Sequence, residues 1–454
     1  MKKPASLLRR AAFAAALSVG AIAATPTLLL STIASAHEFD LDHPDDVEDN
    51  SGPGNGDDFD FDDFDDGDHD NSGPGNGDDF EDHDDDRSGH GSGGDDDHSG
   101  HGGGDRNNDF DIGFIAEEII YSVEYDNRGS EFVPGEIVFV GRAQDLALAL
   151  NAGFTEISVH NLASGGVMAR LGLPRGVGID AAVAQLAQVA PDAITTPNNI
   201  YRSAQTMRTS ALRQPMRRAV RSRGMLGVID TGVDVSSLPS DTLLSQHAFA
   251  GPAPIAREHG SAVASIAVSR GVRVHVADVF GHSADGQLAA SADRIAAAID
   301  WMIAHRVAVV NISIEGPNNG ALAEMVRRAA ERGHIIVAAA GNGGPAARPS
   351  FPAAFESVTA VTAIDESGRP YIRANRGPYI DFAAPGVDVS VEGGAARVSG
   401  TSFAAPVIAA EAAVHLHAPS PTESARVLTN LRARAEDLGE PGHDNIFGWG
   451  ALRD

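Results

Sequence analysis

The chain has 454 residues, a net charge of −29 and no cysteine. This length provides for two or three domains with substantial cores, and the lack of cysteine excludes a small domain held by disulfide bonds. The charge is concentrated, because residues 37–111 carry 29 acidic residues against two arginines, a net −27. The acidity therefore describes one segment, and the rest of the chain is nearly neutral.

The first 36 residues are predicted to be a signal peptide. A basic start, MKKPASLLRR, precedes the apolar stretch AAFAAALSVGAIAATPTLLL and the small-residue motif ASA, which ends at Ala36. This order is typical of a cleaved export signal. An uncleaved membrane anchor is the alternative, which Thr25 and Pro26 within the apolar stretch disfavour. We therefore expect a secreted protein, periplasmic or extracellular, with no membrane span in the mature chain.

Residues 37–111 form a low-complexity acidic segment. The sequence DNSGPGNGDDF occurs at residues 49–59 and again at 70–80, a spacing of 21 residues. So few apolar side chains cannot offset the entropy lost on ordering, so we expect a disordered spacer. Its carboxylates and histidines are ligand types for calcium or transition metals, and loose metal binding is the alternative. Because no fixed ligand spacing is present, no metal site is predicted.

Residues 112–205 alternate between strand and helix patterns. Runs of β-branched and aromatic residues predict strands, and apolar residues at helical spacing predict helices. Strands are expected at 134–141, 156–162, 168–174 and 193–202, and helices at 143–153 and 178–191. This order over fewer than 100 residues indicates a small α+β domain.

Residues 206–223 form a basic linker that is rich in arginine and has no acidic residue. A nucleic-acid surface is one interpretation, but the segment lacks interleaved aromatic residues and any reader motif. We therefore expect an exposed, protease-sensitive connector and no nucleic-acid partner.

Residues 224–454 change to an α/β pattern, in which short apolar strands alternate with amphipathic helices. Strands are expected at 224–230, 273–280, 307–314, 334–342, 358–364 and 379–386, and helices at 259–268, 289–306, 321–333 and from 403 onward. Strands that are apolar throughout are typical of a sheet covered on both faces. The predicted fold class is therefore α/β, an open and mostly parallel sheet with helices on both faces.

Four polar residues fall where such a fold collects its functional groups. Asp230 ends the first strand and Asn342 ends a later one, whereas His259 and Ser402 each open a helix. Functional sites gather at the carboxyl ends of parallel strands. Singly, each residue has an ordinary structural role, such as a cap or a turn. Together, in the order Asp, His, Asn, Ser, they indicate a site for nucleophilic catalysis.

The motifs VIDTGVD, HGSAVASI, NISIEGP, AAGNGG and GTSFAAP resemble the motif series of the subtilisin-like serine proteases. The resemblance covers residues 224–454 and implies peptide hydrolysis through an acyl-enzyme intermediate. Ser402 then corresponds to the nucleophile and His259 to its general base. Asp230 corresponds to the carboxylate that orients the base, and Asn342 to a donor that stabilises the oxyanion.

The motif NISIEGP resembles the family's substrate-binding strand, which pairs with an extended peptide. The resemblance implies that Ser313, Ile314 and Glu315 bind substrate. Glu315 stands where the family usually has glycine. A preference for basic or polar substrate residues is one hypothesis, and a carboxylate directed to solvent is the other.

Two features depart from the family's pattern. Ala262 and Ser265 replace a second histidine and a glycine of the histidine motif, although neither position is catalytic. A short connection follows this motif, where the family usually carries a longer loop that often holds a structural calcium ion. The short connection argues against that calcium site, and no other cofactor is predicted.

The resemblance also gives a meaning to residues 112–205, which are similar to the family's inhibitory, chaperone-like propeptide. Their tail, PNNIYR, would occupy the active site until cleavage between residues 201 and 223, whereas a permanent accessory domain is the alternative. The function favoured is a secreted serine endopeptidase made as an inactive precursor, with polypeptides and its own propeptide as partners. The alternative is a non-catalytic acidic or metal-binding surface protein on a retired protease domain.

Overall fold

A computed structural model describes a small domain up to residue 204 and a larger domain from residue 224; the described residues are 119–204, 206–207, 224–391 and 397–453. The predicted signal peptide (1–36), the acidic segment (37–111) and most of the predicted linker (206–223) lie outside the described residues. Among the described residues, every helix is too short or too polar to span a bilayer.

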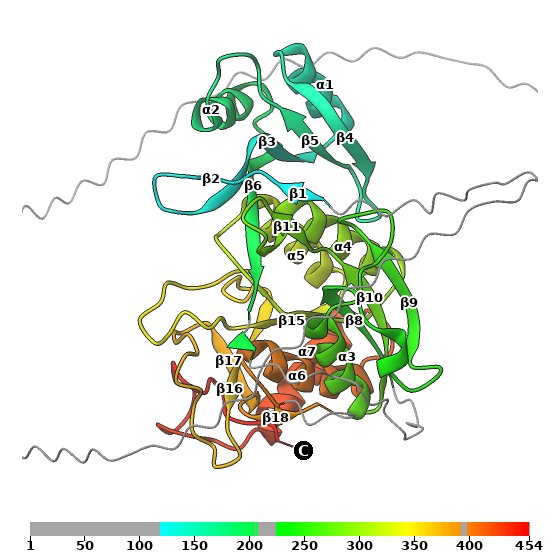
Figure 1. The fold of residues 1–454 in the computed structure, drawn as a ribbon, viewed down its shortest axis with the longest axis vertical. Helices are drawn as coiled ribbons and strands as arrows, with labels where there is room; N and C mark the ends of the chain where they lie inside the picture. Colours follow the sequence, from blue (N-terminus) through cyan, green and yellow to red (C-terminus); the bar gives the residue numbers. More distant parts are fainter. Residues whose placement is uncertain (1–118, 205, 208–223, 392–396, 454) are drawn as a thin grey trace, which may run out of the picture. The chain divides into compact units, whose positions relative to one another are not determined.

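The larger domain is built on a seven-stranded parallel sheet (Figure 1). Its spatial order is β17 (Ile380–Pro385), β16 (Val358–Ile364), β15 (Ile335–Ala339), β13 (Val309–Ile312), β8 (Gly224–Asp230), β10 (Val272–Asp278) and β9 (Leu243–Ala248). All residues of β13, β15 and β16 are buried. A strand covered on both faces favours apolar side chains at nearly every position, which explains the apolar runs in the sequence; Asn311, Thr359 and Thr362 are the buried polar residues in these three strands.

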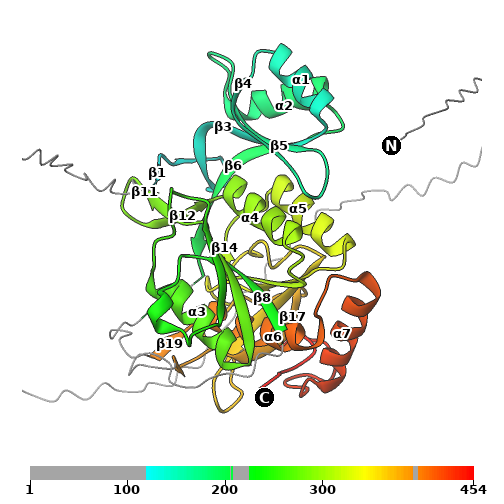
Figure 2. The same cartoon turned by 90° about the vertical axis from the view of Figure 1, so that its right-hand side faces the viewer.

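Helices cover both faces of this sheet (Figure 2). On one face lie α3 (Glu258–Ser269), α6 (Thr401–His415) and α7 (Pro421–Arg434), and on the other lie α4 (Ala292–Ala304) and α5 (Gly320–Glu331). Strand β8 shows the division, because alternate side chains of a strand point to opposite faces. Leu226 and Val228 pack with the first group of helices, and Ile229 packs with the second.

Helix α6 is buried along almost its whole length, as a helix that is apolar all round must be. The residue before it, Gly400, has φ of 153°, a backbone conformation that favours glycine. Ala404 and Ala405 are fully buried. The sequence GTSFAAP thus brings Ser402 into a buried first helical turn, where Gly400, Ala404 and Ala405 are small and Phe403 packs into the core.

The small domain is an antiparallel sheet whose core is completed by two helices. The strand order is β6 (Ile194–Ser203), β3 (Glu131–Gly141), β5 (Val167–Gly172) and β4 (Thr155–Asn161), and the helices are α1 (Ala143–Asn151) and α2 (Ile179–Val189). Ile137, Phe139, Leu171 and Leu186 form the centre of this separate core.

Strand β6 connects the small domain to the larger one. Its first half pairs with β3, whereas its last residues pair antiparallel with β12 (Leu288–Ser291) and β14 (Ile314–Glu315). Strand β11 (Gly281–Ser283) continues this sheet from β12 to β1 (Ile120–Tyr121), and β2 (Glu124–Tyr125) pairs with β3.

The pairing resumes beyond residue 205. Strand β7 (Thr206–Met207) pairs antiparallel with β19 (Arg397–Ser399), which pairs with β18 (Val389–Ser390). The chain therefore pairs with the larger domain on both sides of residue 205, as an extended peptide would.

The fold class predicted from the sequence is confirmed, with differences in detail. The predicted helix 289–306 is wrong at its start, because Leu288–Ser291 form β12 and the helix begins at Ala292. Alanine-rich residues suit a helix locally, and the pairing of β12 with β6 decides otherwise. The predicted strand 307–314 is interrupted at residue 313. His259 and Ser402 are the second residues of their helices, so Ser402 is not an N-cap.

Candidate active site

Asp230 and His259 form a buried pair at one edge of the parallel sheet. Asp230 is the last residue of β8, and its Oδ1 lies 2.7 Å from Nδ1 of His259. Both residues are buried: the exposed fraction is 0% for Asp230 and 2% for His259. The backbone N–H of Thr231 also donates to Oδ1 at 2.7 Å, which holds the carboxylate in place. A carboxylate facing Nδ1 fixes the tautomer that carries its proton there and leaves Nε2 as an acceptor.

A glycine after His259 allows this close approach. A Cβ built on Gly260 would lie 2.3 Å from the carbonyl oxygen of Thr231, and the Gly260 N–H donates to Thr231 Oγ1 at 2.9 Å. The start of α3 is therefore pressed against the end of β8. The sequence pair His-Gly is explained by this contact.

Ser402 and Asn342 converge on one carbonyl group of the small domain. The Ser402 hydroxyl donates to the carbonyl oxygen of Ala204, and Asn342 Nδ2 donates to the same oxygen at 2.7 Å. Ala204 is fully buried there, at the end of β6. The arrangement brings a hydroxyl and an amide donor against a single peptide carbonyl.

The amide of Asn342 is oriented by the residue before Ser402. The Thr401 N–H donates to Asn342 Oδ1 at 3.1 Å, and Thr401 Oγ1 lies 3.3 Å from the same atom. With its oxygen occupied, the amide must turn Nδ2 toward Ala204. The first N–H groups of α6 lack helical acceptors and favour negative charge at this point.

His259 is not hydrogen-bonded to Ser402 in this geometry. Within the described residues, Nε2 of His259 is buried and has no hydrogen-bond partner. Its ring lies 5.5 Å, centroid to centroid, from the ring of Phe403, the residue after Ser402. The hydroxyl of Ser402 is engaged with Ala204 instead. Nε2 therefore remains the free acceptor beside the helix turn that carries the serine.

The predicted substrate-binding strand pairs with the tail of the small domain. The Ala204 N–H donates to the Ser313 carbonyl oxygen at 3.3 Å, and Ile314 and Glu315 stand opposite Ser203 and Arg202. The Ser313 side chain faces away from this strand, since its Oγ donates to the Ser402 carbonyl oxygen at 3.0 Å. Ser313 thus contacts the tail through its backbone and supports α6 through its hydroxyl.

Tyr201, three residues before Ala204, anchors the tail. Its ring is fully buried, and its hydroxyl donates to the Pro317 carbonyl oxygen at 2.8 Å. A Cβ built on Gly316 would lie 2.3 Å from the Tyr201 ring, so glycine is required beside it. The motif letters Gly-Pro after Glu315 thus form the wall of a pocket for this ring.

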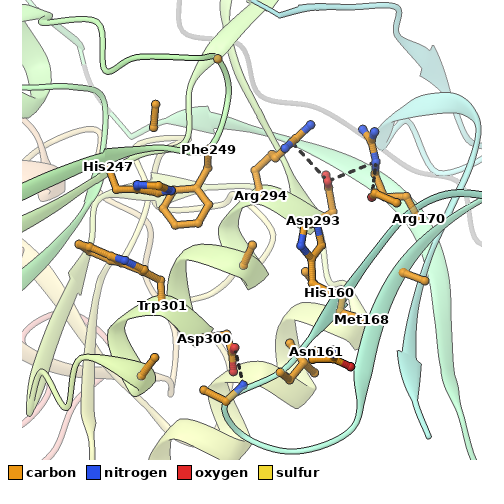
Figure 3. A pocket seen from close by; sticks show the side chains of 18 residues that line it. His160, Asn161, Met168, Arg170, His247, Phe249, Asp293, Arg294, Asp300 and Trp301 are labelled. Carbon is orange, nitrogen blue, oxygen red and sulfur yellow. Dashed lines mark hydrogen bonds and ion pairs between the residues drawn. The ribbon is translucent and has the colours of Figure 1, made fainter. Parts of the chain in front are cut away.

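A second contact between the domains lies around helix α4 (Figure 3). Arg170 of β5 and Arg294 both approach Asp293 Oδ2, with Nε atoms at 3.7 Å and 3.4 Å. Asp300 accepts the N–H groups of Ala163 and Ser164 at 2.7 Å and 3.1 Å. The small domain is therefore held to the larger one by charged contacts in addition to strand pairing.

Asp278 is a buried carboxylate near the site that the sequence did not single out. It ends β10 directly opposite Asp230 on β8, and 3% of the residue is exposed. Burial raises the pKa of Asp278 to about 6, although the N–H groups of Ile255 and Phe280 and the charge of Arg257 oppose the rise. Its place at a strand end, next to Asp230, is the signal that could have found it.

We expect Asp278 to lower stability as pH rises from about 4 to about 6. The unfolded carboxyl ionises near 4 and the folded one near 6, so the native state holds the extra proton between these values. The free energy of unfolding should fall by about 3 kcal/mol over this range and stay lower above it. Asp278→Asn should lack this component in chemical denaturation at pH 4 and 7, measured with Ser402→Ala to prevent autolysis. An unchanged difference between the two proteins at both pH values would contradict the assignment.

The order of the strands, with Asp230, His259, Asn342 and Ser402 gathered at one edge, defines the subtilisin-like class. Comparison with known proteins agrees. The family model described as "Subtilase family" matches residues 222–450. The chain belongs to the subtilase family.

Individual relatives show how far the likeness reaches. Minor extracellular protease Epr of Bacillus subtilis (strain 168) is 33% identical over 159 residues, 34% of this chain and 25% of that protein. Subtilisin Savinase of Lederbergia lenta is 29% identical over 258 residues, 52% of this chain and 92% of that protein.

A solved structure extends the comparison of folds. Fervidolysin from Fervidobacterium pennivorans, described as a keratinolytic enzyme related to subtilisin, matches with a TM-score of 0.57 at 19% identity, over 74% of this chain and 62% of that chain. This share exceeds the half of the chain that the family model covers, so the likeness in fold extends beyond the larger domain. The chain spans a quarter of Epr and less than two thirds of fervidolysin.

Proposed function

We propose that this protein is a secreted serine endopeptidase, made as a precursor whose own chain is its first substrate. Family membership supports the class of reaction. The observation that carries the proposal is the convergence of Ser402 Oγ and Asn342 Nδ2 on the carbonyl oxygen of Ala204. Those are the two groups that must meet a peptide carbonyl when a serine attacks it.

The proposed reaction has two halves, formation of an acyl-enzyme and its hydrolysis, and His259 transfers protons in both. Ser402 Oγ attacks the carbonyl carbon while His259 Nε2 takes its proton, and Asp230 stabilises the imidazolium through Nδ1. Asn342 Nδ2 and the backbone N–H of Ser402 stabilise the oxyanion. Collapse expels the amine, which His259 protonates, and leaves an acyl-enzyme. Water then attacks this ester by the same proton transfers and releases the carboxylic acid.

The bond cut in the precursor is the one between Ala204 and Gln205. The chain pairs with β14 before this bond and with β19 after it, so both sides of the bond are held as a substrate would be. Residues 112–204 then act as a propeptide, one residue shorter than the segment predicted from the sequence, residues 205–223 as a linker and residues 224–454 as the catalytic domain. Sequencing of the purified enzyme should find a new N-terminus at Gln205, or a later one if trimming follows. A chain that stays joined across residue 205 in active enzyme would favour a permanent accessory domain.

The cleaved propeptide should remain bound and inhibit the enzyme. After the cut, β6 keeps its pairing with β12 and β14, and Arg170 and Asp300 keep their contacts around α4. The released carboxyl end would then occupy the site as a product.

Tyr201→Ala is expected to weaken this inhibition strongly. Removing a fully buried aromatic ring costs about 3–5 kcal/mol, or roughly 100- to 4,000-fold in affinity. Tyr201→Phe loses only the hydrogen bond to Pro317, about 1 kcal/mol. The measurement is the rate at which activity appears after the self-cleaved complex is diluted. Equal rates for the alanine and phenylalanine variants would show that the ring does not anchor the tail.

The rival function, a retired protease domain, predicts no reactive serine. A fluorophosphonate probe should label the mature protein at Ser402 if the domain is an enzyme. Export is supported by the signal-like first 36 residues and by the relative that is named an extracellular protease. Absence of the protein from the periplasm and the medium of its host would contradict secretion.

A further inference from the structure

Glu315 lies on the same face of the tail as the side chain of Ala204, the residue before the bond to be cut. Alternate residues of a strand point to the same face, so Ala204 and Arg202 share one. Glu315 is directly opposite Arg202 in the β6–β14 pair, and cross-strand partners also share a face. The carboxylate is therefore a diagonal neighbour of the Ala204 position.

A single residue joins Glu315 to the carbonyl under attack. The Asn342 N–H donates to Glu315 Oε2 at 2.9 Å, while Asn342 Nδ2 donates to the Ala204 carbonyl oxygen at 2.7 Å. A Cβ built on Gly341 would lie 2.9 Å from Glu315 Oε2, so the Glu315 carboxylate packs directly against the backbone of Gly341. Glu315 is thus part of the surface that meets the residue before the bond.

The carboxylate has no cation paired with it among the described residues. Arg202, although opposite, directs its guanidinium to Glu131, Ser283 and Leu288. Burial raises the pKa of Glu315, and the hydrogen bond from the Asn342 N–H and the charge of Arg373 oppose the rise. An open cavity of about 890 Å³ adjoins the carboxylate, and its lining includes Glu315, Gly316 and Asn375 together with Arg128, Arg202 and Arg348. The site therefore combines space with a carboxylate that, among the described residues, none of these arginines holds in a salt bridge.

We propose that Glu315 selects lysine or arginine as the residue before the scissile bond. A basic side chain at the Ala204 position would extend toward the Glu315 carboxylate and neutralise its charge. That carboxylate is hydrogen-bonded to the backbone N–H of Asn342, whose side chain is the oxyanion donor. Because that charge opposes the developing oxyanion, neutralising it favours the transition state as well as binding. Ala204 is too short to use the site. The precursor bond is cut without that interaction because the tail is tethered to the enzyme, which replaces affinity by a high effective concentration.

The test rests on the proposed function and uses substrates built on the protein's own tail. The peptides acetyl-Tyr-Arg-Ser-Xaa-p-nitroanilide, with Xaa arginine, norleucine or alanine, are compared as substrates of the mature enzyme and of the variant Glu315→Gln. Norleucine has an unbranched apolar side chain that reaches the position of arginine Nε and carries no charge, and glutamine keeps the acceptor for Asn342. Glu366→Gln is the matched control, because it removes the same charge from an exposed turn.

The wild type and Glu366→Gln should cleave the arginine peptide at least about tenfold faster, in kcat/KM, than the norleucine peptide. Glu315→Gln should reduce this ratio to near one. The proposal is overturned if the arginine-to-norleucine ratio of kcat/KM is near one in the wild type, or if Glu315→Gln keeps the high ratio of the wild type. In either case, hydrolysis of the alanine peptide still upholds the proposed function. If no peptide is cleaved and fluorophosphonate does not label Ser402, the proposed function fails and the specificity falls with it.

Discussion

Ser402→Ala is expected to leave the Ala204–Gln205 bond intact and to lower peptide hydrolysis about a million-fold. Among the described residues, the hydroxyl is the one group in contact with the Ala204 carbonyl that can form a bond to its carbon; the other contact, Asn342 Nδ2, is a donor. Intact mass, N-terminal sequencing and fluorophosphonate labelling give three independent readouts. The variant should remain folded as an uncut precursor.

Ser367→Ala is the control, because this serine lies in an exposed turn. It should be cut and labelled like the wild type. Cleavage after residue 204 in the purified Ser402→Ala protein, with no active enzyme present, would refute self-processing. Cleavage only after wild-type enzyme is added would agree with it, since one molecule would then cut another.

Asp230→Asn is expected to reduce kcat/KM about 10,000-fold while the fold is retained. Asp230 Oδ1 accepts from both His259 Nδ1 and the Thr231 N–H, so it fixes the imidazole in one tautomer. An amide that turns its NH₂ group toward Nδ1 stabilises the opposite tautomer, whose Nε2 carries a proton and cannot accept one from Ser402. Steady-state kinetics on a peptide anilide would measure the effect.

Asp278→Asn provides the comparison for Asp230→Asn. It removes a buried carboxylate from the neighbouring strand, in direct register with Asp230, and should change activity by less than about tenfold. Equal losses in the two variants would mean that general disruption of the sheet edge, rather than the tautomer of His259, accounts for the effect.

Local patterns in the sequence predicted the sheet and placed four polar residues at strand ends and helix starts, whereas the roles proposed for those residues rest on the resemblance of their motifs to a family. Asp230 and Asn342 could be assigned because parallel strands end at a common edge, and apolar strands are easy to find. The roles of Ser402 and His259 came from the resemblance of their motifs to a family. Neither source supplies distances, so the hydrogen bond of Ser402 to Ala204 was not foreseen.

The features that were missed depend on contacts between distant parts of the chain. Residues 200 and 201 of β6 decide that Ala290 and Ser291 form a strand, about 90 positions away. The position of Ala204 against Asn342 spans 138 residues. No periodicity within either segment encodes such pairings, because they arise only when two finished surfaces meet. The same reason hid the contact between Glu315 and Asn342.

If the small domain is the proposed propeptide, strand β6 links the onset of activity to the stability of that domain. Strand β6 pairs with β3 of the small domain and with β12 and β14 of the larger one, so its end would stay in the active site after the cut. It would leave only when the small domain unfolds and is digested. The core of that domain is small, centred on side chains such as Phe139 and Leu186, and domains of this size are only marginally stable. The delay between the first cut and full activity would then be set by the unfolding rate of the small domain, whose core has eleven buried side chains, and not by the chemistry of the serine.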